Sequence, residues 1–129
     1  MPLTALDLPD EALEKYHPLE AIRRRKVKMS AELSRHRSIA KLTARKAAKL
    51  LRDNFGANEV ILFGSLARRS GFTLVSDIDL AVRGIPSARF FEAVGAVTGM
   101  SADFRIDLIE LETCPPALRR KIEEYGKTL

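Results

Sequence analysis

The sequence predicts an α+β fold: a small mixed β-sheet packed by helices and preceded by a basic helical N-terminal extension. From residue 19 to residue 54 the chain holds no Gly or Pro and is dominated by Ala, Leu, Lys and Arg, which favour helix. After Gly56, short apolar runs alternate with segments of helical composition and with turn residues. The length of 129 residues suits a single domain.

Composition excludes several classes of protein. Apolar residues make up 46% of the chain and charged residues 30%, which suits a packed core rather than a disordered chain. No apolar run reaches the roughly 18–20 residues of a membrane-spanning helix, and the first ten residues do not resemble a signal peptide. The single Cys114 excludes an internal disulfide and a cysteine-cluster zinc site. We expect a soluble, cytoplasmic protein with His17 and His36 at its surface.

The basic residues are concentrated in one part of the chain. Residues 21–52 hold twelve of the 22 Lys and Arg residues and a single acid, Glu32, so this segment carries +11 against −6 for the remainder. Such a segment can attract a polyanion or an acidic protein partner over long range. It can equally be a solvated helix face, or a face docked on the acidic body of its own chain or of a second subunit. Nucleic-acid binding between Arg23 and Arg52 is the less favoured of these alternatives.

A long helix is predicted over residues 19–54, with Pro18 at its first position, where a missing N–H costs nothing. Gly56 is expected to end this helix. We expect a break near Ser34 or Ser38, because the apolar stripe is sparse before these residues. The second half carries apolar side chains at helical spacing: Ala40, Ala44, Ala47, Leu51 and Phe55.

The remaining elements follow from short apolar runs and turn residues. Strands are predicted at residues 59–63, 77–82 and 104–109, and helices at residues 64–69 (as a helix opening), 87–97 and 115–125. Thr113 is the expected N-cap of the last helix, and Gly126 is its expected stop.

Acidic side chains are expected to meet on one face of this sheet. Asp77 and Asp79 point to the same face of their strand, roughly 6.6 Å apart, because side chains alternate along a strand. Asp107 joins them if its strand is a neighbour, with Asp103 as the reserve third acid. Clustered carboxylates raise one another's pKa unless a cation lies among them. Oxygen ligands of this kind suit Mg²⁺ or Mn²⁺.

A Gly-Ser turn precedes these acids and can hold phosphate. Gly64 allows a close approach of the backbone to a phosphate, and the start of a helix offers free N–H groups. Ser65 adds a hydroxyl donor, and Arg68 can face the same anion. A metal site beside a phosphate-binding turn makes a nucleoside triphosphate the natural substrate. Each motif alone is common in proteins, but their combination in this order favours a functional site over ordinary turns and solvated acids.

The motifs resemble a known family. Residues 63–68 (Phe-Gly-Ser-Leu-Ala-Arg), followed by residues 76–80 (Ser-Asp-Ile-Asp-Leu), resemble the signature of the DNA polymerase β-like nucleotidyltransferase superfamily. Its smallest branch, the minimal nucleotidyltransferase (MNT) domain, is the most similar. The resemblance covers roughly residues 44–129, which divides the chain into a basic helical extension (1–43) and an MNT domain (44–129). The loop of eleven residues before Asp77 is about one residue longer than the pattern and unusually apolar at residues 72–75.

The resemblance implies a nucleotidyltransferase fold and a role for each site residue. Asp77, Asp79 and Asp107 would be the catalytic carboxylates and would bind two Mg²⁺ ions, or Mn²⁺. Asp107 would be either a shared metal ligand or the group that takes the proton from the attacking hydroxyl. ATP would be held through its β- and γ-phosphates by Gly64 and Ser65, with help from Arg68. Attack on the α-phosphate would transfer AMP and release pyrophosphate.

The resemblance also implies a partner. Many MNT proteins are MntA-type antitoxins that pair with a helical HEPN-type toxin and transfer AMP to a tyrosine of that toxin. Two alternatives stay open, namely an antitoxin that acts by binding alone and a nucleic-acid-binding protein that uses the basic helix. A homo-oligomer is also left open.

Overall fold

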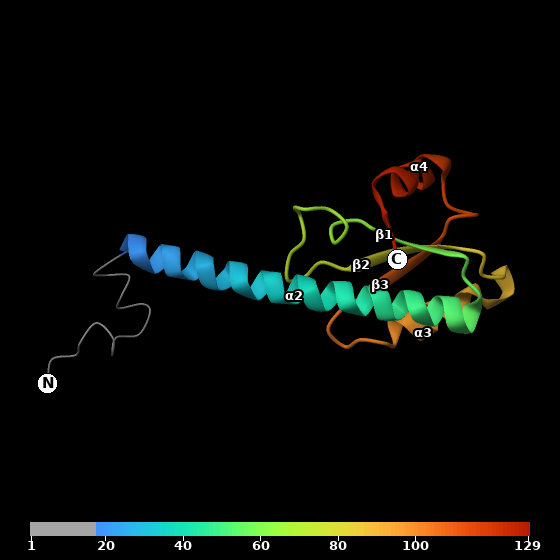
Figure 1. Cartoon of the computed structure of the whole chain (residues 1–129), viewed down its shortest axis with the longest axis horizontal. Coiled ribbons are helices and arrows are strands. Elements are labelled where there is room, and N and C mark those ends of the chain that lie inside the picture. Colours follow the sequence, from blue (N-terminus) through green and yellow to red (C-terminus); the bar gives the residue numbers. More distant parts are fainter. Residues whose placement is uncertain (1–17) are drawn as a thin grey trace, which may run out of the picture. The chain divides into compact units, whose positions relative to one another are not determined.

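The computed structural model describes residues 18–129 and has the predicted α+β architecture (Figure 1). The first part of the predicted extension, residues 1–17, lies outside the described residues. The chain divides into two compact units, Met1–Arg35 and His36–Leu129. The elements in chain order are α2 (Pro18–Phe55), β1 (Glu59–Phe63), β2 (Ile78–Arg83), η1 (Ser87–Arg89), α3 (Phe90–Thr98), β3 (Ile106–Glu110), α4 (Pro116–Tyr125) and β4 (Lys127–Thr128).

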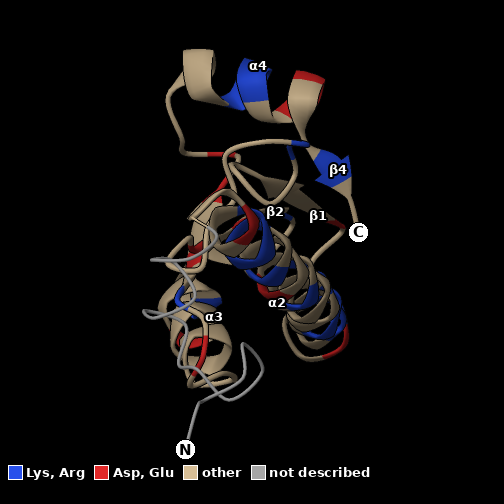
Figure 2. Ribbon diagram, turned by 90° about the vertical axis from the view of Figure 1, so that its left-hand side faces the viewer, with Lys and Arg blue, Asp and Glu red and all other residues tan. Residues whose placement is uncertain are grey.

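Helix α2 runs without interruption through Ser34 and Ser38, so the predicted break is wrong. Two isolated serines among strong helix formers each cost only a few tenths of a kcal/mol, which is too little to end a helix. Lys and Arg side chains recur along α2 (Figure 2). No helix among residues 18–129 has the length and apolar character needed to cross a membrane.

The sheet is mixed, as predicted, with strand order β3-β2-β1-β4. Strand β1 pairs antiparallel with β2 and with β4, whereas β2 pairs parallel with β3. The predicted first strand is confirmed residue for residue, and the second and third begin one and two residues later than predicted. Strand β4 was not predicted, because two exposed residues show no hydrophobic pattern.

Different helices cover the two faces of the sheet. Helix α4 lies over one face, and α3 and the part of α2 in the second unit lie over the other (Figures 1 and 2). On the α4 face, Ile61 and Ala81 pack with Leu111 and Ile122 in a small buried cluster. Side chains of the same parity along β1, β2 and β3 therefore point toward α4, which determines where the acidic residues lie.

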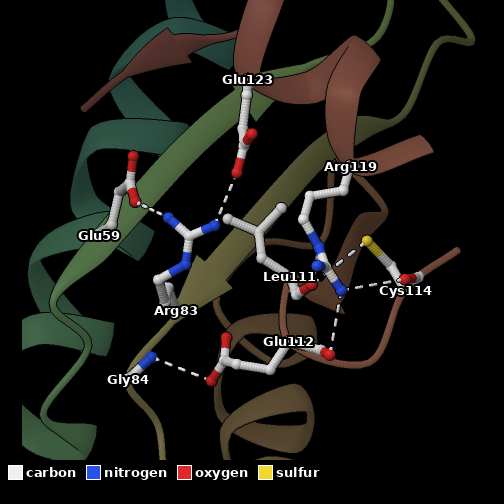
Figure 3. A network of polar contacts seen from close by, with 8 residues as sticks. All are labelled: Glu59, Arg83, Gly84, Leu111, Glu112, Cys114, Arg119 and Glu123. Carbon is white, nitrogen blue, oxygen red and sulfur yellow. Dashed lines mark hydrogen bonds and ion pairs between the residues drawn. The ribbon is translucent and has the colours of Figure 1, made fainter. Parts of the chain in front are cut away.

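Helix α4 is attached to the sheet by arginines (Figure 3). Arg119 donates from Nε to the carbonyl of Leu111 at 2.7 Å, and from Nη2 to the carbonyls of Glu112 at 3.1 Å and Cys114 at 3.4 Å. The predicted cap at Thr113 is wrong, because the N-cap is Pro115 and makes no side-chain capping bond. Arg119, one turn into the helix, instead binds the carbonyls of the preceding turn.

Arg83 makes the second polar attachment of α4. It donates to Glu59 on β1 and to Glu123 on α4, the latter bond being 2.7 Å long (Figure 3). One guanidinium thus joins β1, β2 and α4. These ion pairs are partly exposed, so they fix the orientation of α4 more than they stabilise the fold.

The helix predicted to open at residues 64–69 is absent. Residues 64–68 form two successive turns, in which Ala67 N–H donates to Gly64 and Arg68 N–H donates to Ser65. In a helix, the carbonyls of Leu66 and Arg68 would accept N–H groups four residues onward. They accept instead from the guanidinium of Arg37, a residue of α2 some thirty positions earlier.

Candidate active site

Asp79 lies at the centre of the candidate site. On β2 it is paired with Phe63 of β1 on one side and with Asp107 of β3 on the other, so these three residues form one row across the sheet. Burial, followed by the charges of Asp107 and Asp77, raises the pKa of Asp79 to about 6, and the charge of Arg68 acts in the opposite direction. All three charged neighbours are therefore close enough to Asp79 to interact with it electrostatically.

The other two predicted acids flank Asp79 in different ways. Asp77 directly precedes β2 and is partly buried. Asp107 is 41% exposed, and its Oδ1 accepts a hydrogen bond of 3.2 Å from Nε of Arg105. The reserve acid Asp103 lies in the turn before β3, exposed, with its N–H directed to Oγ of Ser101. The structure therefore brings Asp107, and not Asp103, beside Asp79.

Gly64 brings the predicted phosphate-binding turn directly against the carboxylates. Its φ is +73°, a conformation that side-chain-bearing residues rarely adopt. A Cβ atom at this position would overlap Oδ2 of Asp79 and lie 3.1 Å from its carboxyl carbon. Ser65 follows immediately and is partly buried. The turn and the acids thus form one continuous surface.

Two hollows open on either side of Phe63. The first, of about 230 Å³, is lined by Gly64 and Arg68 from the turn and by Lys121 and Tyr125 from α4. The second, of about 550 Å³, includes Asp79, Arg105 and Asp107. Of the six predicted site residues, Gly64 and Arg68 line the first hollow and Asp79 and Asp107 line the second, and α4 contributes to both. No sequence pattern indicated Lys121 and Tyr125, since their approach to the turn depends on how α4 packs.

The three carboxylates are suitable ligands for a metal ion, although they do not converge on a single position. Among residues 18–129 no group of three His, Cys, Asp or Glu side chains converges closely enough to form a ready metal site. The mutual repulsion that raises the pKa of Asp79 is, however, the condition that a bound cation relieves. Three carboxylates fit a hard divalent ion such as Mg²⁺ or Mn²⁺ in donor type.

The expectation for His36 is wrong. Its Nε2 is buried without a hydrogen-bond partner, and its ring packs between Phe72, with ring centres 5.8 Å apart, and Phe104, at 4.6 Å. His17 lies outside the described residues. The apolar character of residues 72–75 was the available signal, because Phe72 is buried and is the residue that His36 contacts.

A family model described as "Polymerase beta, Nucleotidyltransferase" matches residues 45–129. The chain belongs to the polymerase β nucleotidyltransferase family. The matched region contains all six predicted site residues. The boundary of the MNT domain at residues 43/44 stays a prediction, as do the individual roles of the six residues.

Solved structures similar to this nucleotidyltransferase include toxin–antitoxin complexes. One, a toxin–antitoxin with AMP-PNP, shares 28% identity at a TM-score of 0.55, over 66% of this chain and 70% of that one. Another, tri-AMPylated Shewanella oneidensis HEPN toxin with MNT antitoxin, shares 27% identity at a TM-score of 0.52, over 69% and 70%. A point mutant of an MntA toxin–antitoxin complex shares 30% identity at 0.54, over 66% and 69%. No curated protein matches this chain. The resemblance to MNT domains is confirmed.

Proposed function

We propose that this nucleotidyltransferase is a Mg²⁺-dependent protein adenylyltransferase that moves AMP from ATP to a tyrosine hydroxyl of a HEPN-type toxin, and so acts as its antitoxin. One observation carries the proposal: the backbone of Gly64 lies against Asp79, which is paired in register with Asp107. This proximity supports a single triphosphate that contacts both the turn and the carboxylate pair. The similar complex that holds a tri-AMPylated HEPN toxin supports the choice of acceptor.

Each of the six predicted site residues has a role in the proposed reaction. Ser65 donates its hydroxyl to a phosphate oxygen, and the glycine at position 64 admits the triphosphate close to the backbone. Arg68, whose charge acts on Asp79, balances the charge of the phosphates. Asp77, Asp79 and Asp107 would hold Mg²⁺, which when bound supplies positive charge at the triphosphate.

The bond changes follow from the substrate. The acceptor hydroxyl oxygen bonds to the α-phosphorus, and the bond from that phosphorus to the bridging oxygen of the β-phosphate breaks, so pyrophosphate leaves. The hydroxyl proton passes to a carboxylate, and Asp107 is the candidate because its side chain is 41% exposed and so within reach of an acceptor hydroxyl. Fixed donors and charges that stabilise the transition state would supply most of the acceleration.

The test uses ATP labelled on its α-phosphate, Mg²⁺, this protein and the product of the adjacent gene. Wild type is compared with Asp77→Asn/Asp79→Asn, with a chelator-treated sample, and with Asp103→Asn as a control acid outside the site. We expect label on the partner with wild type and with Asp103→Asn, and none in the other two samples. Absence of label throughout, while wild type and the double variant hold the partner equally well, would overturn the enzyme and leave an antitoxin that acts by contact.

One observation favours an antitoxin that acts by contact: within residues 18–129, the acids do not converge into a group that could hold a metal ion. A contact-only antitoxin would keep its protection of cells after Asp77→Asn/Asp79→Asn. Cell survival with the double variant, measured beside the labelling, therefore distinguishes the two functions.

A further inference from the structure

Arg37 of α2 donates side-chain hydrogen bonds to the turn after Gly64. Its Nη2 donates to the carbonyl of Arg68 at 2.6 Å and to that of Leu66 at 3.3 Å. The first distance is short for N–H···O, as a charged donor produces. Arg37 is partly buried, which differs from a wholly solvated basic face, one of the alternatives that the sequence left open.

These bonds take up backbone acceptors where the predicted helix is absent. The carbonyls of Leu66 and Arg68 are the acceptors that a helix would use to extend through residues 70 and 72. With both carbonyls bound to Arg37, the chain turns away after Arg68. The side chain of Arg68 is thereby kept at the end of the turn, close enough to act on Asp79.

Aromatic packing fixes the guanidinium in this position. Its central carbon lies 5.9 Å from the ring centre of Phe72, a residue in the middle of the same loop. The neighbouring His36 packs on Phe72 and on Phe104, which closely precedes β3. Two consecutive residues of α2 thus contact the first part and the middle of the loop between β1 and β2.

We propose that Arg37 is a positioning residue for the phosphate-binding turn, which holds Ser65 and Arg68 in place for the triphosphate of ATP. This inference rests on the proposed function. The hydrogen bonds of Arg37 go to backbone carbonyls, and its ring contact is with Phe72. It acts through the turn, and its loss is expected to weaken ATP binding more than the chemical step.

The test compares Arg37→Met with Arg37→Lys and with Arg45→Met, which removes an exposed arginine from the same helix. Steady-state AMP transfer is measured as a function of ATP concentration at saturating Mg²⁺. For Arg37→Met we expect KM for ATP to rise about tenfold, with kcat reduced less than about threefold, as suits the loss of a charge-assisted hydrogen bond. Arg37→Lys should be intermediate, since its ammonium group keeps the charge and can donate but lacks the planar geometry of the guanidinium, and Arg45→Met should match wild type.

A merely structural role predicts a different result. If Arg37 only supported packing, Arg37→Met would reduce the active fraction, so that kcat would fall at unchanged KM, and that outcome overturns the inference. Hydrogen exchange provides a measurement that needs no activity: backbone amides of residues 66–72 should exchange faster in Arg37→Met than in Arg45→Met. Equal exchange would also overturn it. Absence of AMP transfer by wild type would instead contradict the proposed function, while the exchange result would still decide the role of Arg37 in the turn.

Discussion

At Gly64 the main chain occupies a left-handed conformation and also leaves no room for a Cβ atom beside Asp79. Gly64→Ala should therefore abolish AMP transfer. It should also lower the free energy of unfolding by more than backbone strain alone would. Gly56→Ala is the matched control, because its φ is +74° and a Cβ atom there would have no neighbour within 4 Å. We expect the free energy of unfolding, measured with urea, to fall by about 1–2 kcal/mol in the control and by at least about 1 kcal/mol more in Gly64→Ala. Equal losses would mean that Asp79 moves aside at no cost.

The raised pKa of Asp79 makes a second prediction at the residue scale. Its folded-state value of about 6 exceeds the ordinary 3.8, so the folded protein binds this proton more tightly than the unfolded chain. The contribution of protonated Asp79 to the free energy of unfolding is therefore fully present at acidic pH and is lost as the pH rises through about 6. In a chelating buffer, Asp79→Asn should therefore be more stable than wild type near neutral pH.

We expect a gain of about 1 kcal/mol for Asp79→Asn, a fraction of the full shift because solvent screens a half-buried group. The gain should disappear at about pH 4, where wild-type Asp79 is already protonated in the folded state. Urea midpoints at both pH values test this expectation. A variant less stable than wild type near neutral pH would show that the carboxylate is not repelled in the free protein.

At the scale of elements, the attachment of α4 depends on Arg119. Arg119→Met removes its hydrogen bonds to three carbonyls and should cost about 2 kcal/mol, with faster hydrogen exchange confined to α4 and the turn before it. Arg120→Met, on an exposed neighbour, should cost less than about 0.5 kcal/mol. Similar losses in both variants would assign the attachment of α4 to its apolar face alone.

The elements that the sequence predicted correctly are those with a local signal. An apolar run bounded by turn residues identified β1 in full, and strand alternation placed Asp79 and Asp107 on one face. The missed features depend on distant partners. The turn after Gly64 resembles a helix start locally, but two of its carbonyls bind Arg37, some thirty residues earlier. The register that pairs the two acids depends on the parallel alignment of β2 and β3, which alternation leaves undetermined.

At the scale of the whole molecule, the charge distribution predicts behaviour toward polyanions. Changing Arg23, Arg24, Lys26 and Lys28 to Gln lowers the formal net charge from +5 to +1. Changing Arg69, Arg120, Lys121 and Lys127 has the same effect on net charge but removes dispersed residues. Because clustered charges produce a stronger local field, the first set should elute from heparin at clearly lower salt than the second. Equal elution would mean that only net charge matters.

The pairing of β2 with β3 also bears on how the molecule folds. Strands β1 and β2 are antiparallel and joined by a loop, whereas parallel β3 can join only after the crossover through α3 is complete. Parallel pairing of this kind is the slow step, since its closure entropy precedes its contacts. We therefore expect Asp79 and Asp107 to come together in the rate-limiting step itself. Their repulsion then raises the folding barrier as well as the free energy of the native state, so relieving it should speed folding, which the refolding rate of Asp79→Asn measures.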